Sequence, residues 1–211
     1  GDGSVGKSSI IARFVNDGFQ KVYAQTIGVD FFEKKLDLRG DKGVMLQIWD
    51  IGGQSISSKN LPNYVRGADV VFMCYDVTNR DSFENCAKWL KAHTASLLPS
   101  SLPCPCGSLG RRAARWARRI QLRLCRAPQE LRTHADSSIV AMLVGNKCDL
   151  KHKQAVDVED AKDFAEDNNL AFIETSAYDA TNVDLAFETS LIEIYRIVRK
   201  NLAAGKYDPT R

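Results

Sequence analysis

The chain opens with Gly1-Asp2-Gly3-Ser4-Val5-Gly6-Lys7-Ser8, a full match to the phosphate-binding loop pattern G-x-x-x-x-G-K-[ST]. Its glycines let the backbone wrap closely around phosphate groups with the N–H groups pointing inward. Lys7 supplies a compact positive charge for the β- and γ-phosphates, and the Ser8 hydroxyl is placed to bind Mg²⁺. Residues 9–15 are predicted to form a helix whose positive end, at Ser9, faces the phosphates. We therefore predict a phosphate site over residues 1–9, against the plainer alternative of a glycine turn before a lysine.

A second motif, Asn146-Lys147-Cys148-Asp149, follows an apolar run at residues 139–145. The Asp149 carboxylate can accept hydrogen bonds from the ring N–H and the amino group of guanine, a donor pair that adenine lacks. Asn146 can bond the base and tie this loop to the phosphate loop, while the aliphatic stem of Lys147 can lie over the base. Glu174-Thr175-Ser176-Ala177 ends another apolar run, and a backbone amide there can reach the guanine carbonyl oxygen. These motifs predict a guanine nucleotide as the ligand.

A third motif lies between them and reads Trp49-Asp50-Ile51-Gly52-Gly53-Gln54. Residues 44–50 alternate as a half-buried strand does, so Asp50 stands at a strand end, where its carboxylate can hold Mg²⁺ through water. Gly53 can turn its N–H onto a γ-phosphate, and Gln54 can orient the attacking water. Upstream, Thr26 can close over Mg²⁺ and the γ-phosphate. We predict Ser8, Thr26 and Asp50 as the metal site, and Lys7 and Gln54 as catalytic residues.

Together these motifs resemble the Ras superfamily of small GTPases, and within it the Rab family fits best. The Rab-like segments are Ile27-Gly28-Val29-Asp30-Phe31, Tyr64-Val65-Arg66-Gly67-Ala68-Asp69 and Tyr75-Asp76-Val77-Thr78. The resemblance covers residues 1–95 and 138–202. It implies that GTP is hydrolysed to GDP with Mg²⁺ as cofactor, slowly unless a GTPase-activating protein helps. It adds Phe19 against the guanine edge and Tyr23 as a lid over the phosphates, and extends the guanine site to Ser176, Ala177 and Tyr178.

The resemblance also implies partners and a location. Exchange factors, GTPase-activating proteins and effectors are expected, with Phe31 and Trp49 as aromatic contacts for effectors. A role in vesicle trafficking follows by analogy alone. The protein is expected in the cytoplasm and peripherally on intracellular membranes. No nucleic acid partner is expected.

Four positions depart from the family pattern. Ile51-Gly52 stands where Thr-Ala is usual, and two adjacent glycines at 52 and 53 should make that segment looser. Ser55 replaces a Glu that is common in Rab proteins, which puts partner contacts at that end in doubt. Tyr178 stands where many relatives have Lys. None of these departures removes a predicted phosphate or magnesium contact.

Composition separates one segment from the rest of the chain. The chain has 211 residues, 44% hydrophobic residues and a formal charge of +3, which suits one α/β domain with a sizeable core. Residues 101–135 carry eight arginines, Glu130 and no lysine, a net charge of +7 that leaves the rest at −4. We predict residues 97–137 to be an insertion that the family lacks, disordered or partly helical. Within it, residues 111–126 fit a basic amphipathic helix for an anionic membrane, with nucleic acid less favoured.

Strand-like and helical patterns alternate along the chain. Strands are predicted at residues 28–38, 44–50, 69–76, 139–145 and 170–175. Helices are predicted at 83–95 with Ser82 as N-cap, at 158–168, and along an apolar stripe formed by Val183, Phe187, Leu191, Ile194 and Val198. This order predicts an α/β P-loop NTPase with a doubly wound, mostly parallel sheet, the small G-protein fold, with its ligand at the strand carboxyl ends.

The ends of the chain and the insertion leave alternatives open. The family's first strand is absent before Gly1, and no prenylation motif ends the tail at residues 203–211. We expect an incomplete N-terminus, or else a truncated product that cycles no nucleotide. A third hypothesis is a membrane- or RNA-binding adaptor that uses the arginine-rich insertion. Deleting residues 97–137 distinguishes the adaptor from a GTPase, because the deletion should abolish the adaptor's binding and leave a GTPase active.

Overall fold

The computed structural model describes residues 1–19, 24–38, 42–53, 65, 67–95 and 139–205. In chain order the elements are α1 (Lys7–Asn16), β1 (Val29–Leu38), β2 (Lys42–Ile51), β3 (Val70–Asp76), α3 (Arg80–Ala95), β4 (Val140–Asn146), the 3-10 turn η1 (Lys151–Lys153), α6 (Val158–Asp167), β5 (Ala171–Thr175) and α7 (Val183–Ala203). Every strand predicted from the sequence is present, with ends that differ by at most two residues. The predicted insertion at residues 97–137, with its helix at 111–126, lies outside the described residues.

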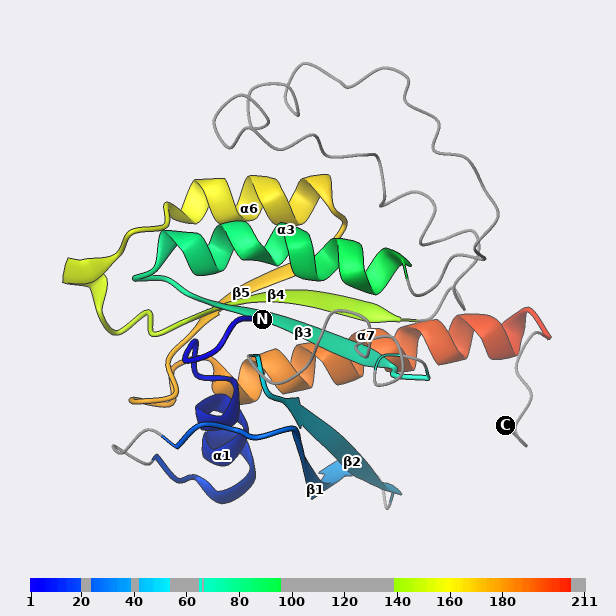
Figure 1. Cartoon of the computed structure of the whole chain (residues 1–211). Coiled ribbons are helices and arrows are strands. Elements are labelled where there is room, and N and C mark those ends of the chain that lie inside the picture. Colours follow the sequence, from blue (N-terminus) through cyan, green and yellow to red (C-terminus); the bar gives the residue numbers. More distant parts are fainter. Residues whose placement is uncertain (20–23, 39–41, 54–64, 66, 96–138, 206–211) are drawn as a thin grey trace, which may run out of the picture.

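The centre of the molecule is a parallel three-stranded sheet in the order β3-β4-β5. Helices α3 and α6 cover one face, and α7 runs along the other with α1 beside it (Figure 1). Runs of apolar residues in β3 and β4 suit this position, because helices bury both faces of these strands. The carboxyl ends of the three parallel strands therefore meet at one edge. The loops that follow Asp76, Asn146 and Thr175 begin there.

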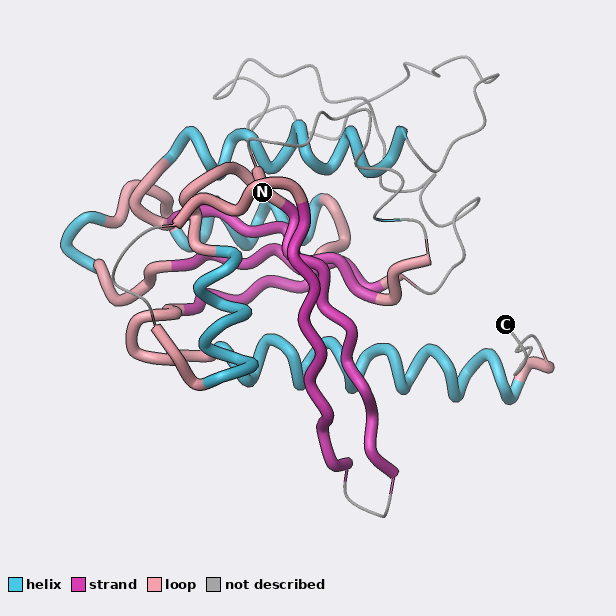
Figure 2. Tube along the Cα trace, turned by 60° about the horizontal axis from the view of Figure 1, so that its bottom comes forward, coloured by secondary structure: helices cyan, strands magenta, loops and turns pink. Residues whose placement is uncertain are grey.

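Strands β1 and β2 form a separate antiparallel ladder, from Val29 opposite Ile51 to Leu38 opposite Lys42. The two-stranded ribbon extends beyond the three-stranded sheet (Figure 2), while its Leu36, Leu46 and Ile48 pack against the buried cluster that contains Phe14 and Phe187. The predicted α/β fold with a mostly parallel sheet is confirmed, although among the described residues β2 and β3 share no ladder. The physical reason is that no described strand lies between them to supply the hydrogen bonds that would join the two parts.

Two buried clusters hold the helices against the three-stranded sheet. On the α3 and α6 face, the rings of Tyr75, Phe83 and Phe164 pack in sequence, with centroids 5.1 and 5.5 Å apart. On the opposite face, Phe14 of α1 stacks on Phe187 of α7 at 3.7 Å. The second contact fixes the direction in which α1 leaves the phosphate loop, because it joins α1 to the helix that covers the sheet.

The predicted apolar stripe on α7 is only partly core. Val183 and Phe187 are buried against the sheet, whereas Leu191, Ile194 and Val198 are half-buried. The helix continues beyond the edge of the three-stranded sheet, as Figure 1 shows, so its later turns have fewer neighbours. The sequence period located the inward face correctly but could not show where the sheet ends.

The start of α3 differs from the prediction. The helix begins at Arg80, so Ser82 lies inside the first turn and the expected N-cap was wrong. Asn79 takes that position, since its Oδ1 accepts a hydrogen bond from the backbone N–H of Ser82 at 3.3 Å. The buried Ser82 hydroxyl instead accepts from the N–H of Asp76 at 3.0 Å and donates to the carbonyl of Asn79 at 2.7 Å. It therefore joins the end of β3 to the start of α3.

Tyr75 provides a test of the core. Its side chain is fully buried, and its hydroxyl has no hydrogen-bond partner among the described residues. Burial raises the pKa of this hydroxyl, so it stays protonated. We expect Tyr75→Phe to raise the free energy of unfolding by about 1 kcal/mol, because an unpaired buried hydroxyl is costly. Urea denaturation measures this, with exposed Tyr195→Phe as the control; a destabilised Tyr75→Phe protein would contradict it.

Candidate nucleotide site

The phosphate loop lies between the end of β3 and the end of β2. Gly6 has φ +92°, and a Cβ there would stand 2.2 Å from the Asn146 side-chain nitrogen, so this position requires glycine. The Lys7 ammonium donates to the carbonyl of Asp2 at 2.6 Å and to that of Gly1 at 3.1 Å. Because of these two bonds, the Lys7 side chain folds over the phosphate loop toward residues 1 and 2. Its charge is thereby held where phosphate oxygens would enter.

Three oxygen-bearing side chains from separate parts of the chain meet beside Lys7. Ser8 Oγ lies 2.7 Å from Thr26 Oγ1 and donates to Asp50 Oδ2, and Thr26 Oγ1 donates to the same oxygen at 3.3 Å. Asp50 is 2% exposed, and its Oδ1 has no partner among the described residues. A buried carboxylate oxygen without a partner, beside two hydroxyls, suits a hard cation that takes oxygen ligands. These residues therefore fit Mg²⁺.

Gly53 places the end of β2 against the phosphate loop. A Cβ on Gly53 would lie 2.4 Å from the carbonyl carbon of Asp2 and 2.5 Å from the nitrogen of Gly3. The preceding Gly52 is buried, and its N–H donates to the carbonyl of Gly28 at 2.9 Å. Both glycines thus sit in close backbone contacts. Gly53 thus packs directly on the loop at Asp2 and Gly3, which suits the predicted contact of its N–H with a γ-phosphate.

Asn146 joins three loops from its position at the end of β4. Its Nδ2 donates to the carbonyl of Val5 at 2.9 Å, and its Oδ1 accepts from Thr175 Oγ1 at 3.4 Å and from the Ala177 N–H at 3.3 Å. The side chain is 2% exposed. Because its donor and its acceptor reach opposite sides, this residue fixes the phosphate loop relative to the loop after β5.

Lys147 is held by contacts on both sides. It has φ +69°, and its ammonium donates to Asp76 at 2.5 Å and to the carbonyl of Ser4 at 3.1 Å. Asp76 also accepts from the N–H and the hydroxyl of Thr78, at 2.8 and 2.7 Å. Sequence reasoning missed this role for Asp76. The available signal was the position of Asp76, an acidic residue at the end of a strand whose carboxyl end faces the site.

The predicted base-recognition side of the site centres on Asp149. Its Oδ1 accepts from the Ser176 hydroxyl at 2.7 Å, and that hydroxyl accepts from the backbone N–H groups of Tyr178 and Asp179 at 3.2 and 3.3 Å. The carboxylate is thus oriented by the loop after β5. Within the same motif, burial and then Glu174 raise the pKa of the Cys148 thiol, which keeps it protonated.

Arg13 is a second residue that sequence reasoning missed. From α1 its guanidinium donates to the carbonyls of Ala177 and Tyr178, each at 2.9 Å, and to Asp17 through the backbone oxygen at 2.9 Å and Oδ1 at 3.1 Å. Two bonds of this fork tie α1 to the loop after β5, and the other two hold the guanidinium at the end of α1. No local sequence signal marks such a role, because the partners lie more than 160 residues away.

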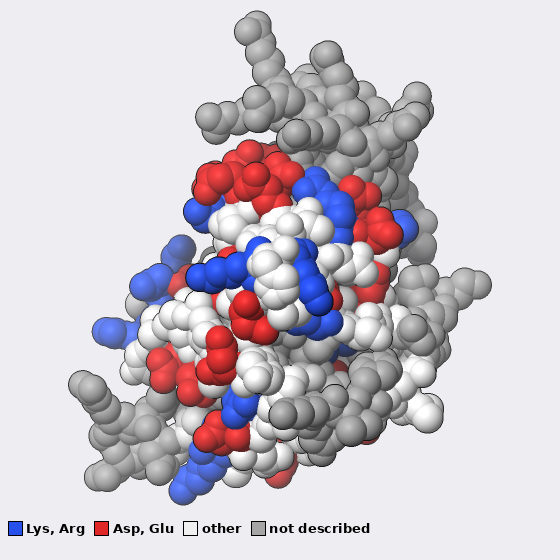
Figure 3. All heavy atoms as spheres, turned by 90° about the vertical axis from the view of Figure 1, so that its left-hand side faces the viewer, with Lys and Arg blue, Asp and Glu red and all other residues white. Residues whose placement is uncertain are grey.

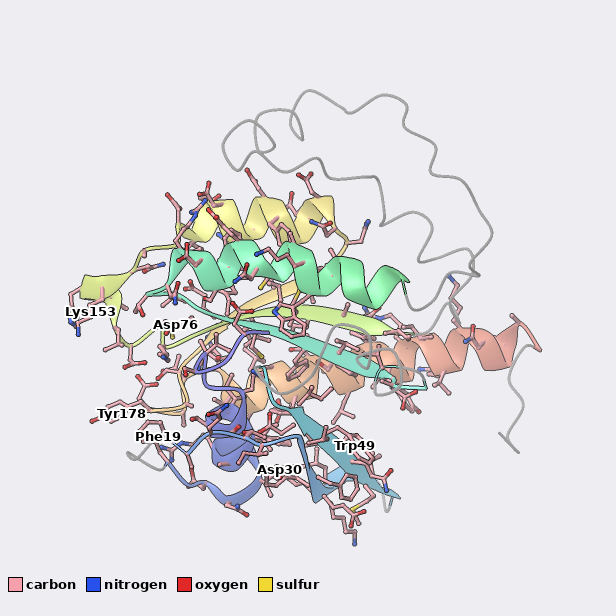
Figure 4. The ribbon with its side chains drawn as sticks, in the orientation of Figure 1. Phe19, Asp30, Trp49, Asp76, Lys153 and Tyr178 are labelled. Atoms are coloured by element: carbon pink, nitrogen blue, oxygen red, sulfur yellow. The ribbon has the colours of Figure 1, made fainter. Side chains whose placement is uncertain are left out.

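Phe19 and Tyr178 stand at the mouth of this region. Their ring centroids are 5.4 Å apart in an edge-to-face arrangement, and Figure 4 shows both at the end of the molecule where the strand-end loops gather. Tyr178 is 58% exposed. On the same end, acidic and basic side chains of the described residues alternate over the surface without forming one basic patch (Figure 3).

The structure brings most of the predicted site residues to one edge. Thr26, Asp50 and Gly53 lie against the phosphate loop at residues 1–9. The predicted guanine-site residues lie beside them: Asn146, Lys147, Asp149, Ser176, Ala177 and Tyr178. Gln54, the predicted catalytic residue, and Tyr23, the predicted lid, lie outside the described residues. No helix among the described residues is long and apolar enough to span a membrane.

Comparison with known proteins identifies the family. The Ras family matches residues 1–101 and 123–196, which leaves out residues 102–122 within the predicted insertion. The GTP-binding protein ypt3 of Schizosaccharomyces pombe is 41% identical over 206 residues, 97% of this chain and 78% of ypt3. Two Arabidopsis thaliana proteins, Ras-related proteins RABA2a and RABA4d, are 40% and 41% identical over 95% and 99% of this chain, and 74% and 77% of their own lengths. The chain therefore belongs to the Ras family of small GTPases, as a Rab-like member.

Proposed function

We propose that this GTPase switches between GTP- and GDP-bound states through the residues that meet at the carboxyl ends of β3, β4 and β5. One observation carries the assignment. Ser8, Thr26 and Asp50 come from three separate segments, and their oxygens converge beside Lys7, with one Asp50 oxygen buried and free among the described residues. Such an arrangement is costly unless a cation occupies it in the working protein.

Hydrolysis in this proposal relies on positioning and charge. Mg²⁺, held by Ser8, Thr26 and Asp50, would offset negative charge on the phosphates. Lys7 and the loop N–H groups stabilise the charge that builds up on phosphate oxygens, and Gln54 steers the attacking water. Asp149 selects guanine, and Asn146 fixes the position of the base-binding loop relative to the phosphate loop. A partner that supplies further positive charge would be needed for fast turnover.

Effectors are proposed to bind the exposed aromatic surface of the β1–β2 ribbon. Phe31 and Trp49 face each other across the ladder with ring centroids 4.8 Å apart, and they are 45% and 55% exposed. Neighbouring Ile27 is 86% exposed. A ribbon that leaves large apolar side chains in water is suited to a protein partner. A role in vesicle trafficking on intracellular membranes belongs to this proposal and rests on the Rab-like relatives.

The testing experiment identifies the bound nucleotide and its turnover. We expect the purified protein, once denatured, to release about one equivalent of GDP or GTP. Single-turnover hydrolysis of GTP with Mg²⁺ should proceed at roughly 10⁻⁴ to 10⁻³ s⁻¹, and removal of Mg²⁺ with EDTA should abolish it and speed nucleotide release. ATP serves as the control substrate. A folded protein that binds neither GDP nor GTP would contradict the proposal.

A further inference from the structure

Asp2 places a carboxylate inside a loop built to receive phosphates. A negative charge at that position would repel a bound nucleotide unless other groups turn it away or compensate it. In the structure, both carboxylate oxygens are bonded to one helix. Asn85 Nδ2 donates to Oδ2 at 2.6 Å, and the Trp89 indole N–H donates to Oδ1 at 2.6 Å. The side chain is therefore engaged by α3, and only the backbone of Asp2 remains for phosphate.

The two donors on α3 are themselves held in place. Asn85 and Trp89 are four residues apart, so they lie on the same face of the helix. The Trp89 ring packs against the buried cluster between the sheet, α3 and α6. Lys88 donates to Asn85 Oδ1 at 2.6 Å, which fixes the amide with its NH₂ group toward Asp2. This short chain of hydrogen bonds ends on a charged group, where such bonds are strongest.

The backbone of Asp2 connects to the two parts of the site that contact phosphate. Its carbonyl accepts from the Lys7 ammonium at 2.6 Å. The same peptide is the surface against which Gly53 packs, with no room for a Cβ between them. A shift of Asp2 would thus move the Lys7 ammonium and change the distance between Gly53 and the phosphate loop. The α3 donors therefore act on the residue whose peptide contacts both Lys7 and Gly53.

From these contacts we propose that Asn85 and Trp89 are positioning residues for the phosphate loop. Through the Asp2 carboxylate they hold the loop against α3, and they keep that carboxylate hydrogen-bonded to α3. The inference rests on the proposed guanine-nucleotide site. It assigns to α3, which contributes no predicted ligand contact, control over how tightly the nucleotide is held.

A double-mutant cycle tests this role. Release of a fluorescent GDP analogue is measured for the parent protein, Trp89→Phe, Asp2→Ala and the double variant, all in Mg²⁺. Trp89→Phe keeps an aromatic ring against the buried cluster but removes the N–H donor together with part of the indole, and the Asp2→Ala background shows how much of the effect is lost packing. We expect it to speed release about tenfold in the parent, in line with the loss of a hydrogen bond to a charged group. In the Asp2→Ala background the same change should alter release less than about twofold, because no carboxylate remains.

The outcomes separate positioning from stability. An equal acceleration by Trp89→Phe in both backgrounds would show a structural effect and overturn the proposal, as would no acceleration in the parent. If Trp89→Phe fails to fold, Asn85→Ala takes its place in the cycle. Equal acceleration in both backgrounds, or no acceleration in the parent, would then overturn the proposal in the same way. Asp81→Asn, an exposed change on α3, is the control. A parent that binds no GDP would overturn the proposed function itself, whereas a parent that binds GDP with additive variants overturns only this inference.

Discussion

Asp149→Asn is expected to weaken GDP and GTP binding by at least about 100-fold and to create affinity for xanthine nucleotides. The carboxylate is proposed to accept two hydrogen bonds from guanine, and bonds to a charged acceptor contribute roughly 1.5–3 kcal/mol each. An amide offers one donor in place of an acceptor, which suits the extra carbonyl of xanthine. Competition of GDP and XDP against a fluorescent nucleotide measures both effects.

The structure suggests that Asp149→Asn leaves the surrounding loop intact. The Ser176 hydroxyl donates to Asp149 Oδ1 at 2.7 Å, and asparagine keeps an oxygen at that position. A gain in XDP binding would show that the variant is folded, so the loss of GDP binding would report specificity. Asp163→Asn on the exposed side of α6 is the control for the change in charge. Unchanged GDP affinity in Asp149→Asn would refute the base assignment.

Gly53→Ala is the second variant for which we expect a large effect. The new Cβ would lie within 2.6 Å of three backbone atoms of Asp2 and Gly3, and backbone cannot rotate away as a side chain can. The end of β2 must therefore move off the phosphate loop, which withdraws the N–H proposed to sense the γ-phosphate. We expect GTP hydrolysis to fall roughly 100-fold, the typical cost of removing one donor to a developing oxyanion. Phosphate release under single-turnover conditions gives the rate.

GDP binding distinguishes this effect from unfolding. The guanine contacts and most of the phosphate loop do not involve Gly53, so the GDP affinity of Gly53→Ala should stay within a few-fold of the parent. Gly18→Ala is the matched control, since a Cβ there meets nothing closer than 3.9 Å. If Gly53→Ala hydrolyses GTP at the parental rate, the close packing of Gly53 on the loop has no role in the switch.

Local sequence was a good guide wherever a few neighbouring residues carry the chemistry. Four features could be recognised without a structure, because each depends on a pattern of at most eight residues. They are the glycines of the phosphate loop, Asp50 at the end of its strand, and the motifs at Asn146 and Ser176. Strand positions were predicted for the same reason, since alternation and apolar runs are local signals. The cap of α3 was missed because Asn79 and Ser82 are both good N-cap residues and only the backbone geometry chooses between them.

The sequence by itself thus determined the family, the guanine nucleotide as ligand and the edge of the sheet where it is proposed to bind. Only the tertiary structure decided what holds that site in shape. The turn of Asp2 toward Asn85 and Trp89, the Arg13 fork on the loop after β5 and the Asp76–Lys147 ion pair join residues 71 to 165 positions apart. Such pairs leave no period or motif in the chain, because they form only when packing of the helices on the sheet brings their side chains within hydrogen-bond distance.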